Sequence, residues 1–145
     1  MITGKAKDCL YAVNGKLLQG SETVIFRGVS INSRTIKEGE LFVCIKGENF
    51  DGHDFIGDAF RKGAAGIILS DTKNLSTGML GKGESPFVIQ SENTLRALQD
   101  LASYQRSLFP FRVIAVTGTN GKSTTKEMIA SIIETKYKTL KTQGN

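Results

Sequence analysis

Among its 145 residues the chain has no tryptophan, and it has only two prolines, two cysteines and one histidine. Cys9 and Cys44 are distant in sequence and no Cys-x-x-Cys pair occurs, so neither a disulfide framework nor a zinc site is predicted. The chain also lacks a basic segment followed by an apolar one, and no apolar run approaches the ~18 residues of a membrane span. We therefore expect a protein of the reducing cytoplasm, in which Cys44 is a small buried hydrophobe.

The charge of the chain favours a small anionic partner. Lys and Arg number 19 against 14 Asp and Glu, which gives a net charge of +5. The lysines are scattered and no basic run contains interleaved aromatic residues, so nucleic acid is not the expected partner. Nucleotide phosphates would account for the excess positive charge as well as nucleic acid would. We expect the chain to be a monomer.

The most informative segment lies at residues 111–134. Phe111–Val116 is a short apolar run rich in β-branched residues, which predicts an inner strand of a parallel sheet. Gly118 and Gly121 follow, and glycines there allow a tight turn whose N–H groups point at phosphate oxygens. A helix is predicted to begin directly after the second glycine, with an apolar stripe that packs on the sheet. The members of that stripe are Thr125, Met128, Ile129, Ile132 and Ile133.

Strand, glycine loop and helix together predict a site for a nucleoside triphosphate and Mg²⁺. Lys122, the candidate catalytic residue, supplies a mobile cation for the β- and γ-phosphates, and the Ser123 hydroxyl is the candidate Mg²⁺ ligand. The helix N-terminus adds about half a positive charge. Val116 stands where the strict P-loop pattern has its first glycine, which leaves open a plain strand-to-helix turn with a solvated Lys122. The candidate nucleotide-binding residues are Gly118, Thr119, Asn120, Gly121, Lys122, Ser123 and Thr124.

Upstream of this segment, strands and helices alternate, which predicts an α/β protein. Strands are expected at residues 23–31, 39–45, 66–70 and 86–90, and polar loops at 46–55 and 71–85. A short helix at 54–62 would end at Gly63. Ser91 is expected to cap a longer helix, whose apolar stripe is formed by Leu95, Leu98, Leu101, Ala102 and Leu108.

Pro110 divides the chain into two predicted units. Residues 1–109 would form the first α/β domain, which includes the long helix, and residues 110–145 the start of a second. This second part holds one strand, one helix and the beginning of another strand at 137–142, and segments below ~40 residues rarely fold alone. It therefore looks truncated, and further Mg²⁺ ligands and acceptor-binding groups are expected from strands outside this chain.

Several stretches resemble the Mur ligase family. Thr117–Met128 is similar to the ATP loop of that family, whose shortened P-loop accounts for Val116. Asn32–Ile56 and Lys62–Ile68 resemble its uridine-nucleotide-binding domain, and the match keeps the same order along nearly the whole chain. Asn32 stands where the family usually has Asp, which bears on hydrogen bonding on the uridine side. Ser123 stands where the family usually has Thr, and it keeps the hydroxyl.

The resemblance implies a small N-terminal uridine-nucleotide-binding domain, followed by the first strand, loop and helix of an ATP-binding P-loop domain. The motifs at Gly47–Phe55, Thr125–Met128 and Thr142–Asn145 are most similar to one branch of the family. That branch joins D-alanyl-D-alanine to UDP-N-acetylmuramoyl-tripeptide in peptidoglycan precursor synthesis, with ATP and Mg²⁺, through an acyl phosphate. The runner-up is the sister branch that adds the third amino acid.

The resemblance also implies a substrate site on the first domain. Its residues would be Ser33, Arg34, Lys46, Gly47, Asn49, Gly52, His53 and Asp54. Simpler roles remain open, because Arg34 could form a surface ion pair and either His53 or Asp54 could cap the short helix.

Two other classes of function remain open from the sequence. A P-loop kinase or GTPase would usually have glycine at position 116, where this chain has Val116. A non-catalytic module that binds uridine nucleotides would need only the first domain.

Overall fold

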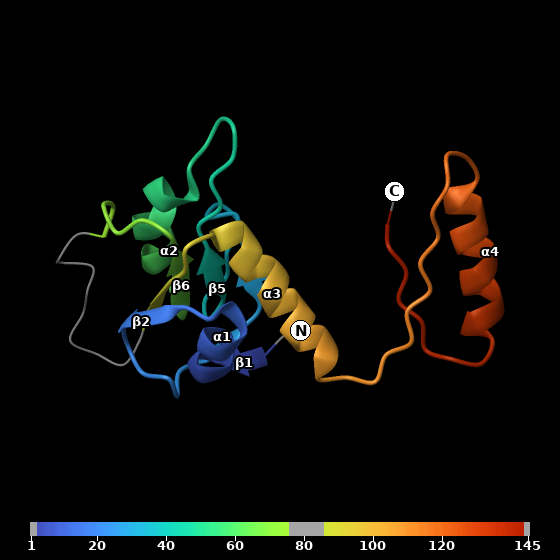
Figure 1. Cartoon of the computed structure of the whole chain (residues 1–145), viewed down its shortest axis with the longest axis horizontal. Coiled ribbons are helices and arrows are strands. Elements are labelled where there is room, and N and C mark those ends of the chain that lie inside the picture. The colour runs from blue at the N-terminus through green and yellow to red at the C-terminus, as the bar shows by residue number, and fades with distance from the viewer. Residues whose placement is uncertain (1–2, 76–85, 144–145) are drawn as a thin grey trace. The chain divides into compact units, whose positions relative to one another are not determined.

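Two units make up the chain in the computed structural model, Met1–Phe109 and Pro110–Asn145 (Figure 1). The structure describes residues 3–75 and 86–143. Of the loop predicted at 71–85, only residues 71–75 are described, and they form neither helix nor strand. The remainder of that loop lies outside the described residues.

A mostly parallel sheet forms the centre of the first unit. Its strands, in spatial order, are β2 (Lys16–Gln19), β7 (Phe87–Gln90), β6 (Gly66–Leu69), β5 (Leu41–Val43) and β4 (Val29–Ser30). Strands β4 to β7 are parallel, and β2 pairs with β7 in the antiparallel sense at one edge. The α/β class and the strands predicted at 39–45, 66–70 and 86–90 are therefore confirmed.

The strand predicted at 23–31 is split in two. Strand β3 (Ile25–Arg27) pairs antiparallel with β1 (Thr3–Lys5) in a separate two-stranded sheet, whereas β4 belongs to the main sheet. Gly28, between them, has a φ of 111°, and a Cβ at this position would lie 3.0 Å from Oε1 of Glu40. Only glycine adopts this conformation without strain, so Gly28 lets the chain leave one sheet and enter the other.

Side chains of the parallel strands alternate between two apolar layers. One layer contains strand residues Val43, Ile68 and Ile89 with residues of helices α1 (Ala6–Val13) and α3 (Thr94–Ser107). The other contains Phe42, Ile67 and Val88 with residues of helix α2 (Ile56–Arg61). Because both faces of the sheet are covered, its strands are continuous apolar runs in the sequence. Cys44 is fully buried in the second layer, as predicted.

The predicted short helix is confirmed in its position. A 3₁₀ turn, η1 (Gly52–Phe55), leads directly into α2, and Gly63 follows the helix with a φ of 79°. Its cap differs from the sequence-based alternatives, because the carboxylate of Asp51 accepts from the backbone N–H of His53. The side chain that caps this turn is therefore that of Asp51, and not that of His53 or Asp54.

Helix α3 has the predicted position, but its cap and its buried face differ. The cap is Asn93, whose Oδ1 accepts from the backbone N–H of Arg96 at 2.9 Å, and not Ser91. Leu101 is buried as expected and Leu98 is half-buried, whereas Leu95, Ala102 and Leu108 are exposed. Small or polar residues, Thr94 and Ala97, occupy the rest of the buried face because α3 packs closely on α1.

Helix α1 has no counterpart in the sequence-based prediction. Its buried residues are Ala6, Cys9 and Val13, which have the spacing of one helical face. The helix is only eight residues long, so its sequence offers two turns of helical pattern and no more.

The second unit contains helix α4 (Lys122–Glu134). Neither strand predicted there, at 111–116 or at 137–142, is formed among the described residues. A strand is stabilised by hydrogen bonds to a neighbouring strand, and no described strand is paired in a sheet with either of these runs. The predicted apolar stripe of α4 is likewise exposed at Met128 (62%) and Ile132 (70%), whereas Ala130 is buried.

Within the described residues, no helix is both long and apolar enough to cross a lipid bilayer.

Candidate functional site

The loops that follow β4, β5, β6 and β7 all emerge at one edge of the sheet in the first unit. This follows from the parallel pairing of these four strands, whose carboxyl ends lie side by side. Ligands of open α/β sheets bind at this kind of edge. The structure brings the predicted substrate residues together there, because Ser33 and Arg34 follow β4 and residues 46–54 follow the neighbouring strand β5.

The loop after β4 is held by two polar side chains. Oδ1 of Asn32 accepts from the backbone N–H of Arg34 at 2.9 Å, and Nζ of Lys62 donates to the carbonyl oxygens of Ser33 and Arg34 at 2.7 and 2.8 Å. An Asn amide oxygen makes this turn as well as an Asp carboxylate does, so the departure at Asn32 leaves the loop turn intact. The sequence-based prediction assigned no role to Lys62. The feature that could have indicated one is its place directly after a helix, where a lysine can reach carbonyl groups.

The two predicted residues of this loop differ in exposure. Ser33 is 7% exposed, whereas Arg34 is exposed and its guanidinium forms no ion pair with any residue in the described parts of the chain. The surface ion pair considered for Arg34 is therefore absent there. An exposed guanidinium that forms no ion pair with the described residues can pair with a phosphate.

The loop after β5 closes tightly on itself. The backbones of Lys46 and Asp51 form an isolated antiparallel β-bridge. The N–H of Gly47 donates to the carbonyl oxygen of Phe50 at 2.9 Å, and the N–H of Gly52 donates to the carbonyl oxygen of Ile45 at 2.9 Å. A Cβ on Gly52 would lie 2.7 Å from the backbone nitrogen of Ile45, so only glycine allows this close approach. The side of the loop that carries Lys46, Gly47 and Asn49 is exposed.

His53 is 5% exposed and connects this loop to the end of β6. Its Nδ1 lies 2.5 Å from Oδ1 of Asp51, and its Nε2 accepts from the backbone N–H of Ser70 at 3.0 Å. The His53 backbone N–H and then its ring hold the pKa of the Asp51 carboxyl below its usual value. Asp54, the last of the predicted substrate residues, is exposed and accepts from the amide of Asn74 at 2.8 Å.

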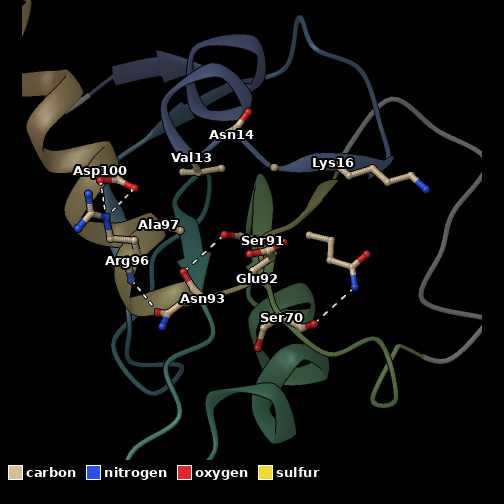
Figure 2. Close-up of a pocket in the computed structure, with 12 residues that line it drawn as sticks. Val13, Asn14, Lys16, Ser70, Ser91, Glu92, Asn93, Arg96, Ala97 and Asp100 are labelled. Atoms are coloured by element: carbon tan, nitrogen blue, oxygen red, sulfur yellow. Dashed lines mark hydrogen bonds and ion pairs between the residues drawn. The ribbon is translucent and has the colours of Figure 1, made fainter.

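A pocket of about 640 Å³ continues along the same edge (Figure 2). It lies between the end of β7, the start of β2 and the N-terminus of α3, and no sequence motif pointed to it. Figure 2 shows the ion pair between Arg96 and Asp100. The Nε of Arg96 lies 3.0 Å from Oδ1 of Asp100, and the Gln90 amide donates to the Ser70 carbonyl oxygen. Its polar lining combines hydroxyl and amide groups with charged side chains, from Asn14, Lys16, Ser70, Gln90, Ser91, Glu92, Asn93, Arg96 and Asp100.

In the second unit, the predicted nucleotide-binding residues form a loop that ends in the first turn of α4. Gly118 and Gly121 have φ values of 149° and 75°, which favour glycine. Nothing lies within 4 Å of the position that a Cβ on Gly121 would take, so a phosphate can approach the backbone there. Nζ of Lys122 donates to the carbonyl oxygen of Gly118 at 2.6 Å, which holds the amino group over the loop.

The residues present fit a phosphate group better than they fit a complete metal site. The open backbone, the lysine and the N-terminus of a 13-residue helix all favour an anion. Among residues 3–75 and 86–143, no group of three or more His, Cys, Asp or Glu side chains could hold a metal ion. Ser123, in the first turn of α4, would contribute one hydroxyl ligand to a Mg²⁺ carried by a nucleotide.

Comparison with known proteins identifies the family. Residues 25–106 match the family described as "Mur ligase family, catalytic domain", which is more than half of the chain. The chain belongs to the Mur ligase family. Residues 116–145 match a second description, "Mur ligase middle domain", so two successive Mur ligase domains are represented.

Two curated Mur ligases illustrate the similarity. The UDP-N-acetylmuramoyl-tripeptide--D-alanyl-D-alanine ligase of Bacillus subtilis is 37% identical, and the alignment covers 100% of this chain and 31% of that protein. The UDP-N-acetylmuramoyl-L-alanyl-D-glutamate--2,6-diaminopimelate ligase of Syntrophomonas wolfei is 41% identical over 74% of this chain and 21% of that protein. The chain thus spans about a third or less of the length of these curated relatives.

Solved Mur ligase structures share the fold. A crystal structure of MurF from Acinetobacter baumannii has a TM-score of 0.84 and 30% identity, and it covers 100% of this chain and 30% of that chain. MurF ligase from Thermotoga maritima in complex with ADP has a TM-score of 0.68 and 36% identity, and it covers 82% of this chain and 26% of that chain.

Proposed function

We propose that the chain supplies the first parts of an ATP-dependent ligase of peptidoglycan precursor synthesis, which joins D-alanyl-D-alanine to UDP-N-acetylmuramoyl-tripeptide. The observation that carries this proposal is the 37% identity to the Bacillus subtilis ligase along the whole chain, both units included. Its two free, buried cysteines suit the reducing cytoplasm, where ATP is available.

The first unit would bind the uridine diphosphate end of the substrate. Arg34 offers an exposed guanidinium on a loop that Asn32 and Lys62 hold in place. The loop at 46–51, which follows the neighbouring strand β5, offers Lys46 and Asn49. A bidentate contact from a guanidinium to a phosphate is among the stronger polar contacts in proteins, so Arg34 would contribute most.

The second unit would bind ATP through residues 118–124. When bound, ATP supplies a γ-phosphoryl group to the tripeptide carboxylate, and the amine of D-alanyl-D-alanine then attacks the acyl phosphate and releases phosphate. Lys122 would hold its ammonium group beside the β- and γ-phosphates, and loop N–H groups would bind their oxygens. The Ser123 hydroxyl would ligate the accompanying Mg²⁺.

A second candidate function is the sister ligase that adds the third amino acid, since the Syntrophomonas wolfei relative is named for diaminopimelate. One observation favours D-alanyl-D-alanine. The alignment with the Bacillus subtilis ligase covers 100% of this chain, whereas the alignment with the Syntrophomonas wolfei relative covers 74%.

Catalysis and simple uridine-nucleotide binding can be separated experimentally. We would join residues 1–145 to the remaining two-thirds of the Bacillus subtilis ligase and measure phosphate release from ATP. An enzyme releases phosphate only when both UDP-N-acetylmuramoyl-tripeptide and D-alanyl-D-alanine are present. Binding of the UDP substrate without such release would favour the non-catalytic module.

A further inference from the structure

The imidazole of His53 makes hydrogen bonds of opposite kinds at its two nitrogens. A backbone N–H can only donate, so Nε2, which lies 3.0 Å from the backbone nitrogen of Ser70, must carry the lone pair. The ring proton is then on Nδ1, which donates to Oδ1 of Asp51 at 2.5 Å. His53 therefore spans from the loop after β5 to the end of β6 in one defined tautomer.

We propose that His53 is a positioning residue, which holds the loop at 46–51 in its binding conformation by joining Asp51 to the Ser70 backbone. The identity of the loop as a uridine-diphosphate site rests on the proposed function, whereas its attachment through His53 does not. The resemblance placed His53 among the substrate contacts. With 5% exposure and both nitrogens engaged, the ring acts instead through the loop.

His53 provides the buried attachment of the loop to the end of β6. Two backbone hydrogen bonds, from Gly47 to Phe50 and from Gly52 to Ile45, close the loop on itself, and neither fixes its orientation against β6. Asp54 also reaches the segment after β6, but its hydrogen bond from the Asn74 amide is exposed to solvent. The buried ring of His53 reaches Ser70 across 17 positions of sequence, so it contributes most to where the exposed face of the loop lies.

The same three residues could be mistaken for a hydrolytic triad, because the Ser70 hydroxyl lies 3.2 Å from Nε2. The single lone pair of Nε2 already accepts from the Ser70 backbone N–H, and the N–H of Asp71 approaches to 3.4 Å. A general base needs that lone pair for the hydroxyl proton. The geometry is that of a structural link.

Protonation of His53 would break the hydrogen bond to the Ser70 backbone. An N–H on Nε2 would face the N–H of Ser70, donor against donor, and would have only the Ser70 hydroxyl oxygen, at 3.2 Å, as an acceptor among the described residues. The titratable and charged groups around the ring, from the end of β5, the loop, η1 and the segment after β6, are Cys44, Lys46, Asp51, Asp54, Asp71 and Lys73.

The first test needs no variant, because His53 is the sole histidine of the chain. Nitrogen NMR of the imidazole in the 145-residue chain should show the Nδ1–H tautomer at neutral pH. On acidification, hydrogen-exchange protection of the Gly47, Gly52 and Ser70 amides should fall as the ring gains its second proton. An Nε2–H tautomer, or loop protection that stays unchanged when the ring is protonated, would overturn the proposal.

Two conservative variants test the two hydrogen bonds of His53, to Asp51 and to Ser70, separately. His53→Gln can place an amide oxygen where Nε2 accepts from Ser70, whereas His53→Asn reaches only toward Asp51. By calorimetry, UDP affinity should fall about tenfold or more in His53→Asn, the cost of an unsatisfied buried N–H, and clearly less in His53→Gln. Equal losses in both, with the fold preserved, would contradict the positioning role.

Ser70→Ala is the matched control, since it removes the hydroxyl and keeps the backbone donor. Its UDP affinity and its loop protection should match those of the wild type, and a loss as large as that of His53→Asn would contradict the backbone link. Absence of UDP binding by the wild-type chain would instead count against the proposed function. The tautomer and exchange measurements decide the role of His53 in that case.

Discussion

Nζ of Lys62 lies 2.7 Å from the carbonyl oxygen of Ser33. Lys62 directly follows α2, and Ser33 lies in the loop after β4, 29 positions earlier. The amino group also donates to the next carbonyl, that of Arg34, at 2.8 Å. One cation therefore fixes the backbone of two adjacent residues in the proposed phosphate-binding loop.

We expect Lys62→Met to weaken UDP binding by roughly five- to tenfold, because charge-assisted hydrogen bonds to two loop carbonyls are lost. Lys62→Arg keeps the charge and should retain most of the affinity. Lys73→Met removes another exposed lysine, which pairs with Asp71 and not with this loop, and it should leave binding unchanged. Equal affinities for wild type and Lys62→Met in calorimetry would show that the loop does not depend on Lys62.

Arg34→Ala should weaken binding of a UDP-sugar by roughly ten- to hundredfold through loss of a guanidinium–phosphate contact. Its thermal stability should change by less than ~1 kcal/mol, since Arg34 is exposed and has no ion-pair partner in the described parts of the chain. Arg27→Ala, at another exposed arginine of the first unit, is the control. Unchanged affinity of Arg34→Ala with the fold preserved would remove Arg34 from the site.

The sequence predicts the buried strands of the sheet well, but it misses the edge strand β2 and the loop contacts, and the reason is physical. Strands such as Gly66–Leu69 are buried on both faces, so a local run of apolar residues is enough to identify them. Contacts such as Lys62 with Ser33 and His53 with Ser70 join positions 29 and 17 residues apart. No local pattern encodes such pairs, although both partners stand within or beside the quoted motifs.

The two thiols should be unreactive in the folded chain. Burial, and to a smaller extent the charge of Asp8, raises the pKa of Cys9 to about 12. Burial, and to a smaller extent the charge of Asp51, raises the pKa of Cys44 well above the usual value of a thiol. Neither thiol forms a thiolate near neutral pH, and both are fully buried. A thiol reagent at pH 8 should therefore modify both only after denaturant is added. Rapid labelling of either thiol in the native chain would contradict the layer assignments.

Lys122→Ala, in the chimera with the Bacillus subtilis remainder, should lower turnover roughly 100-fold or more, because a cation beside the transferred phosphoryl group is lost. The midpoint of thermal unfolding should hardly change, since the hydrogen bonds of this side chain to described residues all go to loop carbonyls. Lys138→Ala, at an exposed lysine outside the loop, controls for the loss of one positive charge. Near-normal turnover of Lys122→Ala would refute the assignment of the ATP site.

The strand predictions in the second unit are wrong, because a strand also needs a neighbouring strand, as every strand of the first unit has. Val113 and Ile114 have the sequence of an inner strand, yet they are 65% and 60% exposed. Strand structure depends on a hydrogen-bonded neighbour, which local composition does not reveal. The helix at 122–134 depends on its own i to i+4 bonds, and it is formed where the sequence predicts it.

Product formation by the chimera tests the central claim most directly. The chimera would receive ATP, Mg²⁺ and, in separate reactions, UDP-N-acetylmuramoyl-tripeptide with D-alanyl-D-alanine or UDP-N-acetylmuramoyl-dipeptide with diaminopimelate, and mass spectrometry would identify the products. We expect the UDP-linked pentapeptide from the first pair and no product from the second. Failure of a folded chimera to form the pentapeptide, where the intact Bacillus subtilis ligase forms it under the same conditions, would contradict the proposed function.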